Sequence, residues 1–184
     1  MTSTIGERMI ELHRSLDAAG LPHAFGGALA LAWCTADPRG TSDIDLNIFV
    51  EPSQAATVVA ALPAALEIDP DDIAALSRDG QTRLWWDEVP VDVFLNTTPF
   101  HTEVAERARI EPFLGIDLPF LACSDLAVFK AFFDRTRDWA DLEDMASAGT
   151  LDRDHLTQAI TDLLGEQDHR LTKIAALPGT DPTT

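Results

Sequence analysis

Hydrophobic positions recur with two different periods along the chain. Apolar and polar residues alternate in residues 43–50, as is typical of a half-buried strand, and residues 82–86 and 89–95 are two further strand candidates on either side of a turn at Asp87 and Glu88. Residues 23–25 are a further short strand candidate. A helical pattern is expected in residues 4–19, 28–35, 52–63, 69–79 and 99–109. Together these patterns predict an α/β (α+β) protein in which helices accompany a small mixed sheet.

The last third of the chain has a helical pattern only. Ser124 is expected to cap a helical stretch that runs, with a bend, to Ala148. Asp152 is expected to cap one more helix or helix pair, which ends at Ala176. The remaining residues are rich in Pro, Gly and Thr and are expected to be disordered. We therefore predict three parts: a core (1–122), a C-terminal helical part (123–177) and a tail (178–184).

Composition and charge narrow the classes of function. The chain has 184 residues, of which 46% are hydrophobic, and its 31 acidic and 13 basic residues give a net charge of −18. Such acidity opposes binding to phosphate backbones over most of the surface. Residues 107–137 are the exception, with 5 basic and 4 acidic residues. An anion-binding surface is expected to use this segment, with acceptor-binding candidates Arg107, Arg109, Arg135 and Arg137.

Neither a membrane span nor a secretory signal is expected. The longest nearly unbroken apolar stretch, residues 24–36, is too short to cross a bilayer, and the N-terminal segment is charged. We therefore expect a cytoplasmic protein. Cys34 and Cys123 lie 89 positions apart without metal-type spacing, so they are expected to be buried thiols. His23 and His101 are expected to be surface residues.

Three carboxylates are the main candidates for chemistry. Asp43 and Asp45 point to the same face of a predicted strand and are suited to a hard cation such as Mg²⁺, although a solvated strand face has the same pattern. Asp92 lies between apolar residues on another strand, where a carboxylate is costly unless it is exposed, paired or bound to metal. If the two strands are neighbours, the carboxylates converge into a site for two-metal-assisted phosphoryl transfer.

Two further segments are suited to phosphate. Gly26 and Gly27 lie where a strand turns into a helix, so a phosphate can approach the backbone N–H groups at the helix N-terminus. Arg39, Thr41 and Ser42 precede the acidic pair and offer a guanidinium and two hydroxyls to a triphosphate. The alternatives are a tight turn that needs glycine and ordinary loop residues.

The order of these motifs resembles the DNA polymerase β-like nucleotidyltransferase superfamily. The resemblance is carried by the segments GGALALAW, RGTSDIDLNIF and VPVDVFLN, although the gap between Gly27 and Asp43 is longer than the commonest spacing. It implies an enzyme that uses Mg²⁺, or Mn²⁺ in its place, and an NTP substrate. It also implies that Asp43, Asp45 and Asp92 are the metal ligands, with Asp92 either a ligand or the base toward the acceptor hydroxyl.

The segment SDLAVFKAFFDRTRDWADLEDM resembles the helix motif of AbiEii-type nucleotidyltransferase toxins, which include the MenT group. Lys130, Asp134, Asp138 and Asp141 follow one another at steps of four, four and three, which places them on one helix face. On this face Lys130 is suited to contact a nucleotide phosphate as a catalytic residue. Asp138 and Asp141 are suited to bind the nucleotide, either by positioning its phosphate or by contacting the base or the metal. The alternative is an exposed, salt-bridged helix face.

The toxin resemblance implies a function and a partner. The protein would move a nucleoside monophosphate to an RNA hydroxyl, at the 3′ acceptor end of tRNA, and a cognate antitoxin would silence it. Thr41 is the expected regulatory phosphorylation site, because a phosphate there adds negative charge where the triphosphate must bind. The alternatives are a small-molecule nucleotidyltransferase that acts on an aminoglycoside-like antibiotic, and a non-catalytic binding module with this fold.

Overall fold

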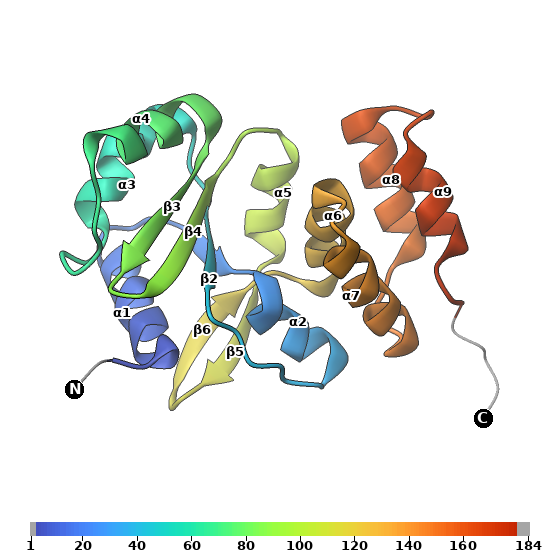
Figure 1. The fold of residues 1–184 in the computed structure, drawn as a ribbon, viewed down its shortest axis with the longest axis horizontal. Helices are drawn as coiled ribbons and strands as arrows, with labels where there is room; N and C mark the ends of the chain where they lie inside the picture. The colour runs from blue at the N-terminus through green and yellow to red at the C-terminus, as the bar shows by residue number, and fades with distance from the viewer. Residues whose placement is uncertain (1–2, 180–184) are drawn as a thin grey trace. The chain divides into compact units, whose positions relative to one another are not determined.

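The computed structural model describes residues 3–179 and forms two compact units (Figure 1). Within the described residues, the first unit comprises residues 3–27 and Gly40–Leu121, and the second comprises Ala28–Arg39 and residues 122–179. A helix from the N-terminal part of the chain therefore belongs with the C-terminal helices. Residues 180–184 of the predicted tail lie outside the described residues.

The first unit contains a six-stranded sheet, which confirms the small mixed sheet expected from the sequence. Its spatial order is β3-β4-β2-β1-β6-β5, and the pairs β2/β4 and β1/β6 are parallel, whereas the other neighbours are antiparallel. The strands are β1 (His23–Phe25), β2 (Ile44–Ile48), β3 (Gln81–Trp86), β4 (Val89–Leu95), β5 (Arg109–Phe113) and β6 (Ile116–Phe120). The β5–β6 hairpin was not predicted. Each of its strands contains a proline, Pro112 or Pro119, which lacks a backbone N–H donor and therefore disfavours a strand assignment.

Polar side chains cap the start of two helices of the first unit, α1 and α4. Thr4 accepts a hydrogen bond from the backbone N–H of Glu7 and starts α1, and Asp69 starts α4 in the same way. The helix α4 lies beside β3 (Figure 1). The helices are α1 (Ile5–Ala18), α3 (Ala55–Ala61), α4 (Pro70–Asp79) and α5 (Phe100–Arg107), with the short 3₁₀ helix η1 (Pro52–Gln54) before α3.

The two faces of the central strands differ in burial. Leu46 on β2 and its register partner Val93 on β4 are fully buried, whereas Asp92 and Phe94 are partly exposed on the opposite face. This difference follows from the period of two along a strand. The polar face of β2 and β4 is therefore open to solvent where it carries the carboxylates.

The second unit is helical. Its helices are α2 (Gly27–Thr35), α6 (Cys123–Phe133), α7 (Thr136–Ser147), α8 (Arg153–Leu164) and α9 (His169–Ala176). The first residue of α2, Gly27, still belongs to the first unit. Asp152 caps α8 as predicted, but α6 begins after Ala122 with no side-chain cap, so Ser124 does not start this helix. No helix within residues 3–179 is both long and apolar enough to cross a bilayer.

The prediction that the two cysteines are buried free thiols is wrong. Cys34 on α2 and Cys123 at the start of α6 form a disulfide, with Cα atoms 5.6 Å apart, and are therefore not free thiols. The bond closes a loop of 89 positions and ties the N-terminal helix of the second unit to its C-terminal helices. Spacing along the chain does not reveal such a pair, because the partners meet only through tertiary packing.

Candidate functional site

The parallel pairing of β2 and β4 brings two of the predicted carboxylates together. Asp45 and Asp92 are register partners on these strands, so their side chains leave the same face of the sheet at neighbouring positions. Asp43 immediately precedes β2. The expectation that the two strands are neighbours is thus confirmed.

The loop before β2 orients Asp43. The Thr41 hydroxyl donates a hydrogen bond to Oδ1 of Asp43 at 2.6 Å and also lies 3.1 Å from the backbone carbonyl of the same residue. Ser42 is exposed and Thr41 is partly buried. The hydroxyl of Thr41 thus contacts a candidate metal ligand directly, and its phosphorylation stays a prediction.

Two glycines lie against Asp45. The backbone N–H of Gly26 donates to the carbonyl of Asp45 at 2.9 Å. Gly27 has a positive φ of 57°, and a Cβ atom there would lie only 1.8 Å from Oδ2 of Asp45. Glycine is required at position 27 both for its backbone conformation and for the space that the carboxylate occupies.

Arg83 on β3 also belongs to this site, although the sequence analysis did not single it out. Its Nε and Nη2 atoms donate to Oδ1 and Oδ2 of Asp92 at 2.7 and 2.8 Å. The hydrogen bonds that Arg83 donates to Asp92, and then the charge of Asp92, raise the pKa of Arg83 above its ordinary value, and the charges of Asp43 and Asp45 act in the same direction. The guanidinium therefore experiences all three carboxylates.

The register of the β3–β4 hairpin explains this contact. Asp87 and Glu88 form the predicted turn, and Arg83 and Asp92 lie four residues before and after it, which makes them register partners. Partners directly opposite in an antiparallel pair share a face of the sheet. Counting outward from the turn would therefore have identified Arg83 from the sequence.

The chemistry of the donors suits a hard divalent cation, but the arrangement is not a complete metal centre. Carboxylate oxygens are the ligands that Mg²⁺ prefers, and the missing Cβ of Gly27 leaves room for the Asp45 carboxylate. Both oxygens of Asp92, however, accept hydrogen bonds from Arg83. Among the described residues, no group of three or more Asp, Glu, His or Cys side chains is placed to hold a metal ion.

The predicted Lys130 motif forms a buried ion cluster in the second unit. Lys130 is 7% exposed, and its Nζ atom lies 2.5 Å from Asp141 and 4.0 Å from Asp138. Arg39 forms a second ion pair with Asp141. Burial raises the pKa of Asp141, but the hydrogen bonds from Lys130 and Arg39 outweigh this effect and leave the pKa below its ordinary value. The alternative interpretation, an exposed helix face with salt bridges, therefore holds for the ion pairs but not for the exposure of Lys130.

The prediction of one continuous helix face is also wrong. Asp134 has a positive φ of 57° and ends α6, and α7 starts two residues later. The Asp134 carboxylate accepts hydrogen bonds from Trp139, His169 and Lys173 instead. Lys130 and Asp141 meet because α6 and α7 pack against each other, and not through spacing along one helix.

The four predicted acceptor-binding arginines are divided between the two units. Arg107 pairs with Glu103 at 3.2 Å and Arg109 with Glu111 at 2.5 Å in the first unit. In the second unit, Arg135 pairs with Asp138 at 2.7 Å, and Arg137 is exposed. Neighbouring carboxylates thus offset the positive charge of three of the four arginines. Their role in acceptor binding stays a prediction.

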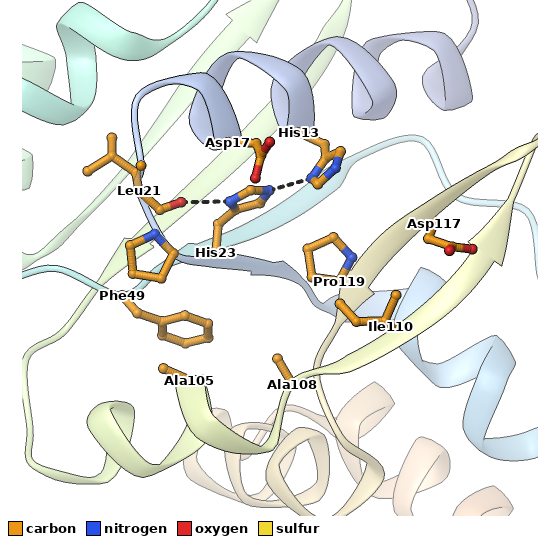
Figure 2. Close-up of a pocket in the computed structure, with 12 residues that line it drawn as sticks. His13, Asp17, Leu21, His23, Phe49, Ala105, Ala108, Ile110, Asp117 and Pro119 are labelled. Atoms are coloured by element: carbon orange, nitrogen blue, oxygen red, sulfur yellow. Dashed lines mark hydrogen bonds between the residues drawn. The ribbon is translucent and has the colours of Figure 1, made fainter.

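A separate pocket of about 600 Å³ lies at the start of β1, at the other end of this strand from Gly26 (Figure 2). His23, which lines the pocket, is only 7% exposed, so its predicted surface position is wrong. Its Nδ1 lies 2.8 Å from the Leu21 carbonyl, which can only accept, and its Nε2 lies 2.9 Å from Nδ1 of His13. Burial lowers the pKa of His23, which favours the neutral ring and makes Nε2 the acceptor toward His13.

The predicted surface position of His101 is also wrong. This residue lies on α5 with 9% of its surface exposed, and its Nδ1 is 3.0 Å from the Thr98 hydroxyl. Burial lowers the pKa of His101 as well. His101 was expected at the surface because it lies in the first helical turn after Pro99, and His23 because it lies near Gly26 and Gly27. Neither position along the chain reports how the elements pack against each other.

Comparison with protein-family models and with the sequences of curated proteins gives no match. Solved structures do match. An antigenic nucleotidyltransferase-like protein from Paracoccidioides brasiliensis aligns with a TM-score of 0.52 and 15% identity, over 95% of this chain and 93% of that chain. The solution structure of the antibiotic-resistance factor ANT(2'')-Ia aligns with a TM-score of 0.55 and 13% identity, over 96% of this chain and 90% of that chain. The crystal structure of ANT(2'')-Ia in complex with adenylyl-2''-tobramycin aligns with a TM-score of 0.54 and 12% identity, over 95% of this chain and 97% of that chain.

The chain has a nucleotidyltransferase-like fold. The polymerase β-like core expected from the order of the motifs is thereby confirmed at the level of fold. The narrower resemblance to AbiEii-type toxins stays a prediction, as do the roles of the individual site residues.

Proposed function

We propose that the protein is a metal-dependent nucleotidyltransferase, and the observation that carries this proposal is the alignment of Asp45 with Asp92 beside Asp43. Asp45 and Asp92 lie on a partly exposed face of a nucleotidyltransferase-like sheet, and Asp43 immediately precedes β2. Mg²⁺, or Mn²⁺ in its place, would be held by Asp43 and Asp45 and would stabilise the negative charge of the triphosphate. Asp92 would complete the ligand set or accept the proton of the acceptor hydroxyl.

The proposed reaction transfers a nucleoside monophosphate. The acceptor oxygen forms a bond to the α-phosphorus of the NTP while the bond from that phosphorus to the bridging oxygen breaks. Pyrophosphate leaves, and the hydroxyl proton passes to a carboxylate or to solvent. Gly26 and Gly27 would let phosphate approach the start of α2, with Thr41 and Ser42 as neighbouring hydroxyls. Arg39 and Lys130 would offset phosphate charge once freed from Asp141.

Two acceptors are supported by different observations. The segment around Lys130, Asp138 and Asp141 resembles AbiEii-type toxins and supports the 3′ end of tRNA, with an antitoxin as partner. The net charge of −18 and the paired arginines support a small cationic polyol of the aminoglycoside type instead. The likeness to ANT(2'')-Ia in complex with adenylyl-2''-tobramycin agrees with this second acceptor.

The test is transfer of label from each α-³²P NTP, with Mg²⁺ or Mn²⁺, to total tRNA and to a panel of aminoglycosides. We expect label in one acceptor class and none with Asp45→Asn, which removes a charged metal ligand. Asp117→Asn is the matched control, because it removes one exposed carboxylate on β6 and should leave transfer unchanged. Equal transfer by the Asp45→Asn variant would refute the site. No label in either class would favour a non-catalytic binding module.

A further inference from the structure

The contact between Arg83 and Asp92 has no role in the function proposed above. It is a two-pronged ion pair in which one guanidinium occupies both oxygens of a candidate metal ligand. Arg83 is 54% exposed, whereas the Asp92 side chain is 17% exposed. The arginine therefore comes from the solvent side and covers a carboxylate that is anchored in the sheet.

The row of charges across the sheet places Arg83 in competition with a cation. Asp45 and Arg83 are register partners of Asp92 on its two sides, so the order across three strands is Asp45, Asp92, Arg83. Neighbouring strands lie about 4.8 Å apart. A divalent cation between Asp45 and Asp92 would bring three positive charges onto one small acidic cluster, and the guanidinium would oppose it by Coulomb repulsion.

Arg83 has space to move away from Asp92. A pocket of about 270 Å³ adjoins the pair and is lined by residues that include Gln81, Thr82 and Phe94. Arg83 also lies on β3, which is the edge strand of the sheet at this side. Release of the ion pair therefore requires no rearrangement of packed side chains.

We propose that Arg83 is an internal counter-ion that occupies Asp92 in the substrate-free protein and competes with a divalent cation for this carboxylate. The cation alone then binds through Asp43 and Asp45, and Asp92 joins the ligands only when Arg83 leaves. The inference rests on the proposed function, because it takes the three carboxylates as cation ligands. Its test, however, measures cation binding directly and needs no nucleotide or acceptor.

The experiment is titration of the full-length, substrate-free protein with Mn²⁺, followed by electron paramagnetic resonance of the free ion. Arg83→Gln should lower the Kd for Mn²⁺ roughly fivefold or more, because it removes both a competing ion pair and a nearby positive charge. Arg83→Lys should give a smaller gain, since lysine keeps the charge but cannot form the fork. Adding Asp92→Asn to Arg83→Gln should abolish the gain. Circular dichroism checks that each variant is folded.

Arg78→Gln is the matched control. Arg78 makes the same two-pronged contact with Asp79 on the exposed end of α4, so its loss changes the net charge equally. Unchanged Mn²⁺ affinity in this variant, with tighter binding in Arg83→Gln, supports the proposal. The proposal is overturned if Arg83→Gln and Arg78→Gln raise the Mn²⁺ affinity equally. It is also overturned if Arg83→Gln does not raise the affinity while Asp45→Asn weakens Mn²⁺ binding. Both results leave the proposed function standing. If Asp45→Asn does not weaken Mn²⁺ binding, the metal site of the proposed function fails as well.

Discussion

At the scale of single residues, Gly27 controls the position of Asp45. The backbone at Gly27 has a φ of 57°, and the Asp45 carboxylate fills the space where a side chain would begin. An alanine would meet two obstacles at once, an unfavourable backbone conformation and a collision with a charged oxygen. This glycine therefore connects the turn after β1 to the chemistry of β2.

Gly27→Ala should lower the free energy of unfolding by about 1–2 kcal/mol from the backbone conformation alone, and it should weaken Mn²⁺ binding by displacing Asp45. Urea unfolding and Mn²⁺ titration measure the two effects. Gly40→Ala is the control, because nothing lies within 4 Å of a Cβ at that position, and its stability should stay within about 0.5 kcal/mol of the wild type. Wild-type values for Gly27→Ala in both measurements would contradict this account.

At the scale of elements, the second unit depends on contacts that join helices distant in sequence. The disulfide links α2 to α6, and Asp134 at the break between α6 and α7 accepts hydrogen bonds from His169 and Lys173 of α9. These hydrogen bonds, from Lys173 first and then from His169 and Trp139, hold the pKa of Asp134 well below its usual range. The helices of this unit are thus held together by covalent and charged links as well as by apolar packing.

Replacement of both cysteines, Cys34→Ser with Cys123→Ser, should lower the free energy of unfolding by about 2–4 kcal/mol, because the unfolded chain gains the freedom of a long open loop. Urea unfolding with and without reductant measures this difference. The wild type in reductant should match the double variant, whose own stability should not respond to reductant. Two free thiols in denatured protein purified without reductant would show that the bond is absent.

At the scale of the whole molecule, buried histidines link stability to pH. Burial lowers the pKa of His23 and His101 below the ordinary value of 6.5. Below pH 6.5 the unfolded chain therefore binds protons that the folded chain does not, and the free energy of unfolding falls as the pH falls toward the folded-state pKa values. Above this range both states hold neutral histidines, and the effect vanishes.

The free energy of unfolding should decrease between about pH 7 and pH 5 with a slope of up to about 1.4 kcal/mol per pH unit for each of these histidines. Urea unfolding at a series of pH values measures the slope. The double variant His23→Gln with His101→Gln should be much less dependent on pH in this range, and each single variant should lie between it and the wild type. A wild-type stability that stays constant over this range would refute the assignment.

The sequence by itself determined the elements and the candidates that depend on local spacing. The alternation in residues 43–50 predicted that Asp43 and Asp45 share one face, and Thr4 and Asp69 marked helix starts, because side-chain direction and capping depend on residues only a few positions apart. The register of Arg83 with Asp92 was also encoded locally, by the two-residue turn, although it was not recognised.

Only the tertiary structure decided the contacts between distant segments. It paired Cys34 with Cys123, buried His23 and His101, and replaced a single helix face by two helices that bring Lys130 to Asp141. It also joined α2 to the C-terminal helices. Each of these outcomes depends on which elements pack together, and packing is set by the combined burial of many side chains far apart in the chain, which no local pattern records.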